Sequence, residues 1–143
     1  MNNPNPAINE IQNLISVNFE RMVAFEQATF NAGTNQLKQY FEEKANESEK
    51  NMEELNDVLF SINESMFDVE SDTSKTLLGT TPLFTGQKNI NSLLKHVQYL
   101  EKSMISWYKQ GIINLKGQSL NTIQVLNKQY TDLKTSQLYL QNC

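Results

Sequence analysis

The fold of this chain is decided by residues 41–62, which read FEEKANESEKNMEELNDVLFSI. Within this stretch, small or apolar side chains recur at alternating intervals of four and three residues: Phe41, Ala45, Ser48, Met52, Leu55, Leu59 and Ile62. This spacing is typical of one face of an α-helix that packs against other helices. The glutamates fall beside or opposite that face, and we interpret most of them as solvated. A helix is therefore predicted from about residue 36 to residue 62.

The residues before this stretch predict a helix that pairs with it. Between residues 7 and 30 a helical stripe, interrupted at Asn18, is formed by Ile8, Ile11, Leu14, Ile15, Phe19, Met22, Val23, Phe25 and Phe30. Gly33 suits a left-handed cap at its end, and Thr34 or Asn35 suits the start of the next helix. Because the linker is short, the two helices are expected to be antiparallel neighbours.

The rest of the chain predicts a second pair of helices, at about 87–115 and 119–140, with Gly117 expected to cap the turn between them. The inner face of the last helix is expected at Leu120, Ile123, Leu126, Tyr130, Leu133, Gln137 and Leu140. Residues 67–85 show no clear period and are expected to form a long crossover, held against the bundle by Leu77, Leu78, Leu83 and Phe84. The predicted fold is all-α: a ferritin-like four-helix bundle of two antiparallel hairpins joined by this crossover. We expect one domain, 1–143, with a disordered head at 1–5.

The composition excludes several common activities. The chain has 143 residues, with 16 acidic against 12 basic side chains and a net charge of −4. A single histidine, His96, and a single cysteine, Cys143, exclude a multi-histidine or cysteine zinc site and an internal disulfide within one chain. The acidic balance and the lack of a basic block argue against nucleic-acid binding, and no apolar run is long enough to span a membrane. Without a signal-peptide core at the start, a cytoplasmic protein is expected.

Two glutamates, Glu26 and Glu101, are placed among apolar neighbours by their helical phase. A ferritin-like metal site needs one glutamate from each of two helices and a Glu-x-x-His from each of the other two. The chain has no Glu-x-x-His, and His96 lies beside the seam residue Val97, where it is expected to edge the core. Two interpretations stay open. Either Glu26 and Glu101 are hydrogen-bonded carboxylates of the core or its flank, or they hold iron or manganese together with Glu47 or water.

Helical stretches over most of the chain are similar to a known family: residues 8–28, 37–41 followed by 51–55, 100–109 and 126–130. Together they resemble an uncharacterised bacterial ferritin-like (rubrerythrin-like) family of unknown function. The resemblance implies a ferritin-like four-helix bundle in which Glu26 and Glu101 match acidic positions. Asn51 and Gln137 stand roughly where metal-binding relatives such as rubrerythrins have histidine. This departure argues against a metal cofactor and against ferroxidase or peroxidase activity.

The function predicted from these residues is that of a non-enzymatic, metal-free bundle serving as a binding or interaction module, with a stress response suggested by the wider fold. The alternative is the residual iron or manganese site just described. A third interpretation is a small-molecule pocket bordered by Trp107, Tyr108 and Tyr130. A partner, either a second copy or another protein, is expected on apolar residues that lie off the main seams: Val17, Phe60, Ile105, Ile113, Val125 and Leu138.

Overall fold

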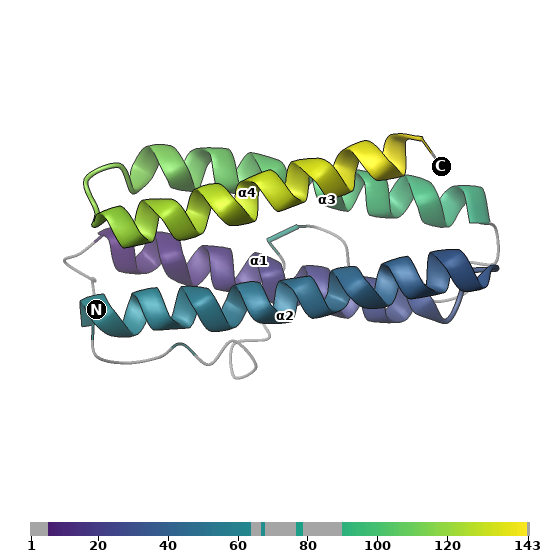
Figure 1. Cartoon of the computed structure of the whole chain (residues 1–143), viewed down its shortest axis with the longest axis horizontal. Helices are drawn as coiled ribbons and strands as arrows, with labels where there is room; N and C mark the ends of the chain where they lie inside the picture. The colour runs from purple at the N-terminus through teal and green to yellow at the C-terminus, as the bar shows by residue number, and fades with distance from the viewer. Residues whose placement is uncertain (1–5, 64–66, 68–76, 79–89, 143) are drawn as a thin grey trace.

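The computed structural model describes residues 6–63, 67, 77–78 and 90–142, and these residues form four α-helices and no strand. The helices are α1 (Pro6–Thr29), α2 (Asn35–Asn63), α3 (Ile90–Asn114) and α4 (Leu120–Gln141). They lie side by side along a common long axis (Figure 1). The predicted all-α class with four helices is therefore confirmed for the described part of the chain. The predicted disordered head and most of the predicted crossover lie outside the described residues.

The short connection between α1 and α2 ends one helix and begins the next as its residues predict. Gly33 has a φ of 82°, the left-handed conformation that glycine adopts without steric strain. Thr34 caps α2, because its Oγ1 accepts a hydrogen bond from the backbone N–H of Leu37 at 3.2 Å. Ser119 caps α4 in the same way by accepting from the Thr122 N–H at 3.2 Å.

Replacing Gly33 by alanine is expected to lower the free energy of unfolding by about 1 kcal/mol, because an L side chain strains a left-handed backbone. Space is not the cause, since the nearest atom to an added Cβ is Ile90 Cδ1 at 4.0 Å. Unfolding in urea measures the difference. Gly117 is the matched control: its φ is not positive, so the expected glycine cap there is wrong, and nothing lies within 4 Å of an added Cβ. Equal stability of the two alanine variants contradicts the prediction.

The apolar core lies between the helices and continues along the bundle. Its largest fully buried apolar side chains include Ile11, Leu14, Ile15, Phe25, Phe41, Leu55, Leu59, Leu93, Leu100 and Met104. The rings of Phe25 and Phe41 join α1 to α2, with their centroids 5.7 Å apart. Eight polar or charged side chains are buried as well: Asn18, Arg21, Ser48, Asn51, Glu101, Thr122, Gln129 and Ser136. Buried polar groups need partners, and all of these residues except Thr122, whose hydroxyl lies 3.0 Å from Ser119 Oγ, have partners among one another.

The inner face of α4 differs from the one predicted. Leu120 is 73% exposed, whereas Tyr130 and Gln137 are only half-buried. The buried residues of this helix are Thr122, Leu126, Gln129, Leu133, Ser136 and Leu140. Because half of this face is polar, the apolar residues alone do not reveal its phase.

The segment at Leu77 and Leu78 is attached to α1. The carboxylate of Glu20 accepts hydrogen bonds from the backbone N–H groups of Leu77, at 2.7 Å, and Leu78, at 2.9 Å. Leu78 is buried, and Leu77 is partly buried and packs against the core, so the prediction that these two leucines pack against the bundle is confirmed. The other two residues of that prediction, Leu83 and Phe84, lie outside the described residues. Burial raises the pKa of Glu20 above its usual value, against the two backbone hydrogen bonds, which lower it. Within the described ranges, none of the helices is long and apolar enough to cross a membrane.

Candidate functional site

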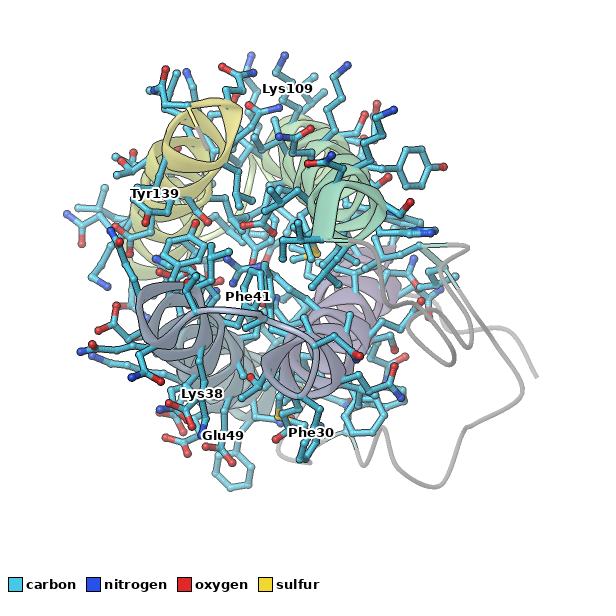
Figure 2. All side chains as sticks on the ribbon, turned by 90° about the vertical axis from the view of Figure 1, so that its right-hand side faces the viewer. Phe30, Lys38, Phe41, Glu49, Lys109 and Tyr139 are labelled. Carbon is cyan, nitrogen blue, oxygen red and sulfur yellow. The ribbon has the colours of Figure 1, made fainter. Side chains whose placement is uncertain are left out.

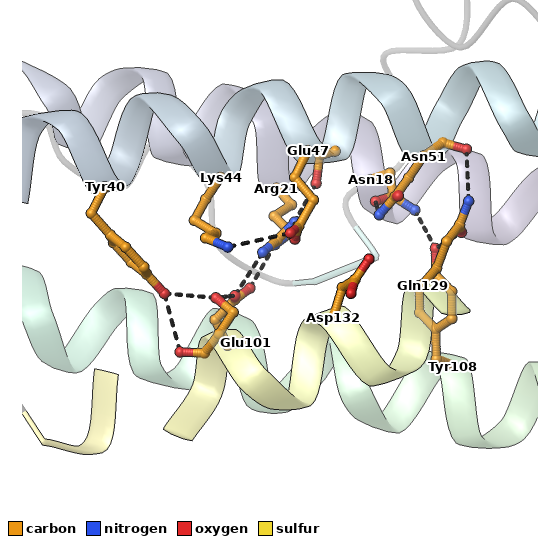
Figure 3. A network of polar contacts seen from close by, with 12 residues as sticks. Asn18, Arg21, Tyr40, Lys44, Glu47, Asn51, Glu101, Tyr108, Gln129 and Asp132 are labelled. Carbon is orange, nitrogen blue, oxygen red and sulfur yellow. Dashed lines mark hydrogen bonds and ion pairs between the residues drawn. The ribbon is translucent and has the colours of Figure 1, made fainter. Parts of the chain in front are cut away.

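The centre of the bundle holds a charged side chain that sequence reasoning missed. Arg21 on α1 is fully buried and is the chain's single arginine. Its Nε and Nη2 donate to the two carboxylate oxygens of Glu101 on α3, at 2.7 and 2.8 Å. Its Nη1 donates to Ser48 Oγ on α2 at 2.9 Å (Figure 3). The pair has the two-pronged geometry that makes arginine–carboxylate contacts strong and directional.

A second carboxylate connects this pair to the surface. Glu47 Oε1 lies 2.9 Å from Arg21 Nη1, and Glu47 Oε2 accepts from Lys44 Nζ at 3.2 Å. The Glu47 side chain is 20% exposed. Its Oε1 makes no hydrogen bond with a described residue, so its contact with Arg21 is an ion pair without hydrogen-bond alignment. From the helix surface to the core, the charged side chains therefore follow one another in the order Lys44, Glu47, Arg21 and Glu101. The formal charges of these two cations and two carboxylates cancel.

The fourth helix completes this layer. Ser136 Oγ on α4 donates to Glu101 Oε2 at 2.6 Å. The Tyr40 hydroxyl of α2 lies 2.7 Å from the same Ser136 Oγ. Since Ser136 uses its proton on the carboxylate, the single proton of the Tyr40 hydroxyl is shared between Ser136 Oγ and the Ser136 backbone carbonyl oxygen, which accepts at 3.1 Å. Each of the four helices thus contributes at least one polar side chain to the layer around Arg21.

A neighbouring layer is also built from one residue of each helix. Asn18 Nδ2 donates to the Tyr108 hydroxyl at 2.8 Å, and Tyr108 donates to Gln129 Oε1 at 2.6 Å. Asn51 Nδ2 donates to Asn18 Oδ1 at 3.2 Å. Gln129 Nε2 donates to the Asn51 carbonyl at 3.3 Å and to Glu54 Oε1 at 2.9 Å. Figure 3 shows both layers beside each other along the bundle axis.

The electrostatics keep Arg21 charged and the buried phenols neutral. Burial alone would lower the pKa of Arg21, but the charge and hydrogen bonds of Glu101, together with the charge of Glu47, outweigh it and raise that pKa above the normal range. Burial raises the pKa of Tyr108 and of Tyr40 above their ordinary value. Both hydroxyls therefore keep their protons at neutral pH and can serve as donors in the network.

The three predicted metal ligands do not lie together. Glu101 is fully buried, as predicted from its helical phase, and Glu47 lies near it. Glu26 is exposed, so the expectation that it faces inward is wrong. The inner face of α1 passes through Arg21 and Phe25, and the next residue along a helix is rotated by about 100° from the one before it. The Phe25 side chain is therefore buried in the core, whereas the Glu26 side chain is exposed.

The donor set around Arg21 does not fit a divalent metal. Both oxygens of Glu101 are engaged, Oε1 by Arg21 and Oε2 by Arg21 and Ser136. The position between Glu101 and Glu47 is taken by the guanidinium, whose positive charge would repel a metal ion. Among the described residues, no group of three or more His, Cys, Asp or Glu side chains is arranged to hold a metal. His96 is half-buried on α3, and Cys143 is not described.

The three aromatic residues predicted to border a pocket have separate environments. Tyr108 is buried in the polar layer. Trp107 lines an open hollow of about 620 Å³ on α3, which neither Tyr108 nor Tyr130 lines. Tyr130 is half-buried on α4, with Lys134 Nζ 5.3 Å from its ring centroid.

The sequence does contain a signal for Arg21. The series Leu14, Asn18, Arg21, Phe25 and Ala28 alternates steps of four and three, so Asn18 and Arg21 continue the buried face of α1 instead of interrupting it. The chain has one arginine against eleven lysines, and arginine is the cation suited to buried ion pairs. Its partner, Glu101, follows from the same spacing on α3.

Over the described residues, the fold and its centre define an all-helical arrangement of four helices with a buried arginine–glutamate pair. No protein-family model, curated protein or solved structure matches this chain. Function is therefore argued from the geometry of the bundle.

Proposed function

We propose that this chain is a non-enzymatic, metal-free bundle of the ferritin-like arrangement, and that it acts as a binding or interaction module. The observation that carries the proposal is the arginine–glutamate pair at its centre. Arg21 supplies from within the chain the positive charge that Glu101 requires when buried. In a carboxylate metal site the bound cation supplies that charge, and here the guanidinium already does so.

The ferritin-like arrangement has support from the contacts between helices. Along α1 and α2, Asn18 contacts Asn51 and Arg21 contacts Ser48, so residue numbers fall in one helix as they rise in the other. In Figure 1 α2 ends and α3 begins at opposite ends of the bundle. Two antiparallel hairpins joined by a connection along the bundle would have this appearance.

The polar centre supports a role in interaction over one in catalysis. Arg21, Glu101, Ser136 and Tyr108 all have partners within the chain. The hollows at the described residues lie instead on outer faces, one along α3 and one between α1 and α2. A partner that binds this bundle would therefore meet its surface.

Protein purified without chelator is expected to contain less than about 0.1 equivalent of iron, manganese or zinc, because Arg21 takes the place of the cation. Elemental analysis measures the content. The melting temperature is expected to be the same with EDTA, with added Mn²⁺ and with neither. Stoichiometric metal, or a melting temperature that falls with EDTA, overturns the proposal in favour of the carboxylate site. A Glu101→Gln variant then reports whether the metal is held at this centre.

A further inference from the structure

The two helical hairpins carry opposite charge. Residues 6–63 contain ten acidic side chains against Arg21 and three lysines. Residues 90–142 contain six lysines against two acidic side chains, Glu101 and Asp132. Since Glu101 is buried against Arg21, the outer surface of the second hairpin is more basic still. The overall charge of −4 conceals this separation.

The basic charge is concentrated along one face of α3 and its C-terminal end. Lys95, Lys102, Lys109 and Lys116 follow one another at intervals of seven residues, and all four are exposed. A step of seven residues is nearly two turns, so successive lysines on α3, from Lys95 to Lys102 and from Lys102 to Lys109, lie within about 20° of each other around the helix. Lys116 follows in the turn just after α3. None of them forms an ion pair with a described residue. We call these four residues the lysine face.

An open hollow adds apolar surface to the lysine face. Lys102 and Lys109 line it together with Trp107 and with Tyr99, which is 58% exposed. Aromatic rings flanked by ammonium groups provide a surface for an apolar side chain that has carboxylates beside it.

The matching features lie on the other side of the bundle. Glu42, Glu49, Glu53 and Asp57 are exposed on α2, and we call these four residues the acidic face. Beside them Phe30 is 87% exposed and lines a second hollow, of about 560 Å³, together with Glu26 and Glu42. Figure 2, viewed along the bundle, places Lys109 on one side and Glu49 and Phe30 on the opposite side. The two faces of one molecule therefore cannot contact each other.

We propose that the lysine face of one molecule docks on the acidic face of a second copy of this chain, with Phe30 reaching the aromatic hollow on α3. The proposal rests on the proposed function as an interaction module, for which it names a second copy as the partner and these two faces as the binding surfaces. A second copy is favoured because the chain itself presents the complementary charge and the exposed apolar side chain. The lengths also correspond, since Lys95, Lys102 and Lys109 extend over about 21 Å of α3 and the acids over about 22 Å of α2.

The apolar residues predicted to bind a partner are only partly available for it. Val17 and Ile105 are buried and Val125 is half-buried, whereas Phe60, Ile113 and Leu138 are 51–60% exposed. Phe60 lies on α2 beyond Asp57 and extends the acidic face. The contact is therefore mainly electrostatic, and it joins two different surfaces. Such a head-to-tail contact leaves one face of each kind free and can continue into larger assemblies.

Sedimentation velocity over a range of protein concentrations tests this inference. Wild-type protein is expected to self-associate at about 10 mM salt and to lose at least about tenfold in affinity by about 300 mM, because salt screens exposed charges. Two double variants each neutralise one face: Lys102→Glu/Lys109→Glu leaves the lysine face with no net charge and keeps the acidic face, and Glu49→Lys/Glu53→Lys leaves the acidic face with no net charge and keeps the lysine face. Each variant alone is expected to be monomeric. An equimolar mixture of the two is expected to associate, because each then presents the charge that the other lacks.

The matched control is Lys128→Glu/Lys134→Glu, which makes the same change in net charge on α4 and leaves all four residues of the lysine face in place. It is expected to associate like the wild type. The inference is overturned if the wild-type protein stays monomeric at low salt, or if the mixture of the two variants stays monomeric. It is also overturned if the wild type binds vesicles of anionic lipid or a nucleic acid through Lys102 and Lys109 without self-associating. These outcomes do not affect the metal analysis, so this inference and the proposed function can fail separately.

Discussion

Replacing Arg21 by methionine is expected to lower the free energy of unfolding by about 3–5 kcal/mol, because it leaves the buried carboxylate of Glu101 without its counter-charge. Glu101 is fully buried, and water cannot take over the two hydrogen bonds that Arg21 donates at 2.7 and 2.8 Å. Glu47 loses the same cation. Unfolding in urea, followed by circular dichroism, measures the change, and an Arg21→Met variant as stable as the wild type would show that the pair is not formed.

A second substitution separates the loss of charge balance from the loss of packing. The double variant Arg21→Met/Glu101→Leu removes both charges, and we expect it to recover most of the lost stability. Arg21→Lys keeps the charge but loses the two-pronged contact, so its stability should lie between those of the wild type and Arg21→Met. If the double variant is less stable than Arg21→Met alone, packing around the guanidinium matters more than its charge.

Replacing Tyr108 by phenylalanine is expected to lower the free energy of unfolding by about 2–3 kcal/mol, because its hydroxyl holds two buried side chains at once. Gln129 Oε1 loses its donor at 2.6 Å, and Asn18 Nδ2 loses an acceptor at 2.8 Å. Asn18 keeps its bond to the Leu14 carbonyl, so the larger part of the effect comes from Gln129. The same urea experiment measures it.

Tyr130→Phe is the matched control for this variant. Tyr130 is half-buried, and its hydroxyl has no hydrogen bond with a described residue, so we expect a change below about 0.5 kcal/mol. The double variant Tyr108→Phe/Gln129→Leu removes the orphaned acceptor and should recover part of the loss. Similar stabilities for the Tyr108 and Tyr130 variants would contradict the assignment of Tyr108 as the link between its neighbours.

The helices could be predicted because their signals are local. The seam through Phe41, Leu55 and Leu59 predicts a buried face of α2, and these residues are buried. Gly33 and Thr34 end and begin helices through their own backbone and side-chain preferences. Such preferences act over one or two turns, so a single stretch of sequence is sufficient to recognise them.

The centre of the bundle was predicted only in part. The inward position of Glu101 follows from its helical phase, and the structure confirms it. For α1 the apolar stripe favoured Glu26, treated Asn18 as an interruption and passed over Arg21, because apolar periodicity counts polar residues as surface. These residues are buried because each finds its partner on another helix: Arg21 and Glu101 are eighty positions apart in the chain.

The amino-acid sequence by itself determined that the chain is helical, where the helices begin and end to within a few residues, and that one histidine and one cysteine leave few options for metal chemistry. Tertiary structure alone decided which polar residues face inward and what neutralises them. It also decided that the face formed by lysines spaced seven residues apart lies opposite the acids of α2. The physical reason is that burial of a charge depends on a partner supplied by a distant part of the chain. Periodicity along one helix shows a face, but it does not show what that face meets.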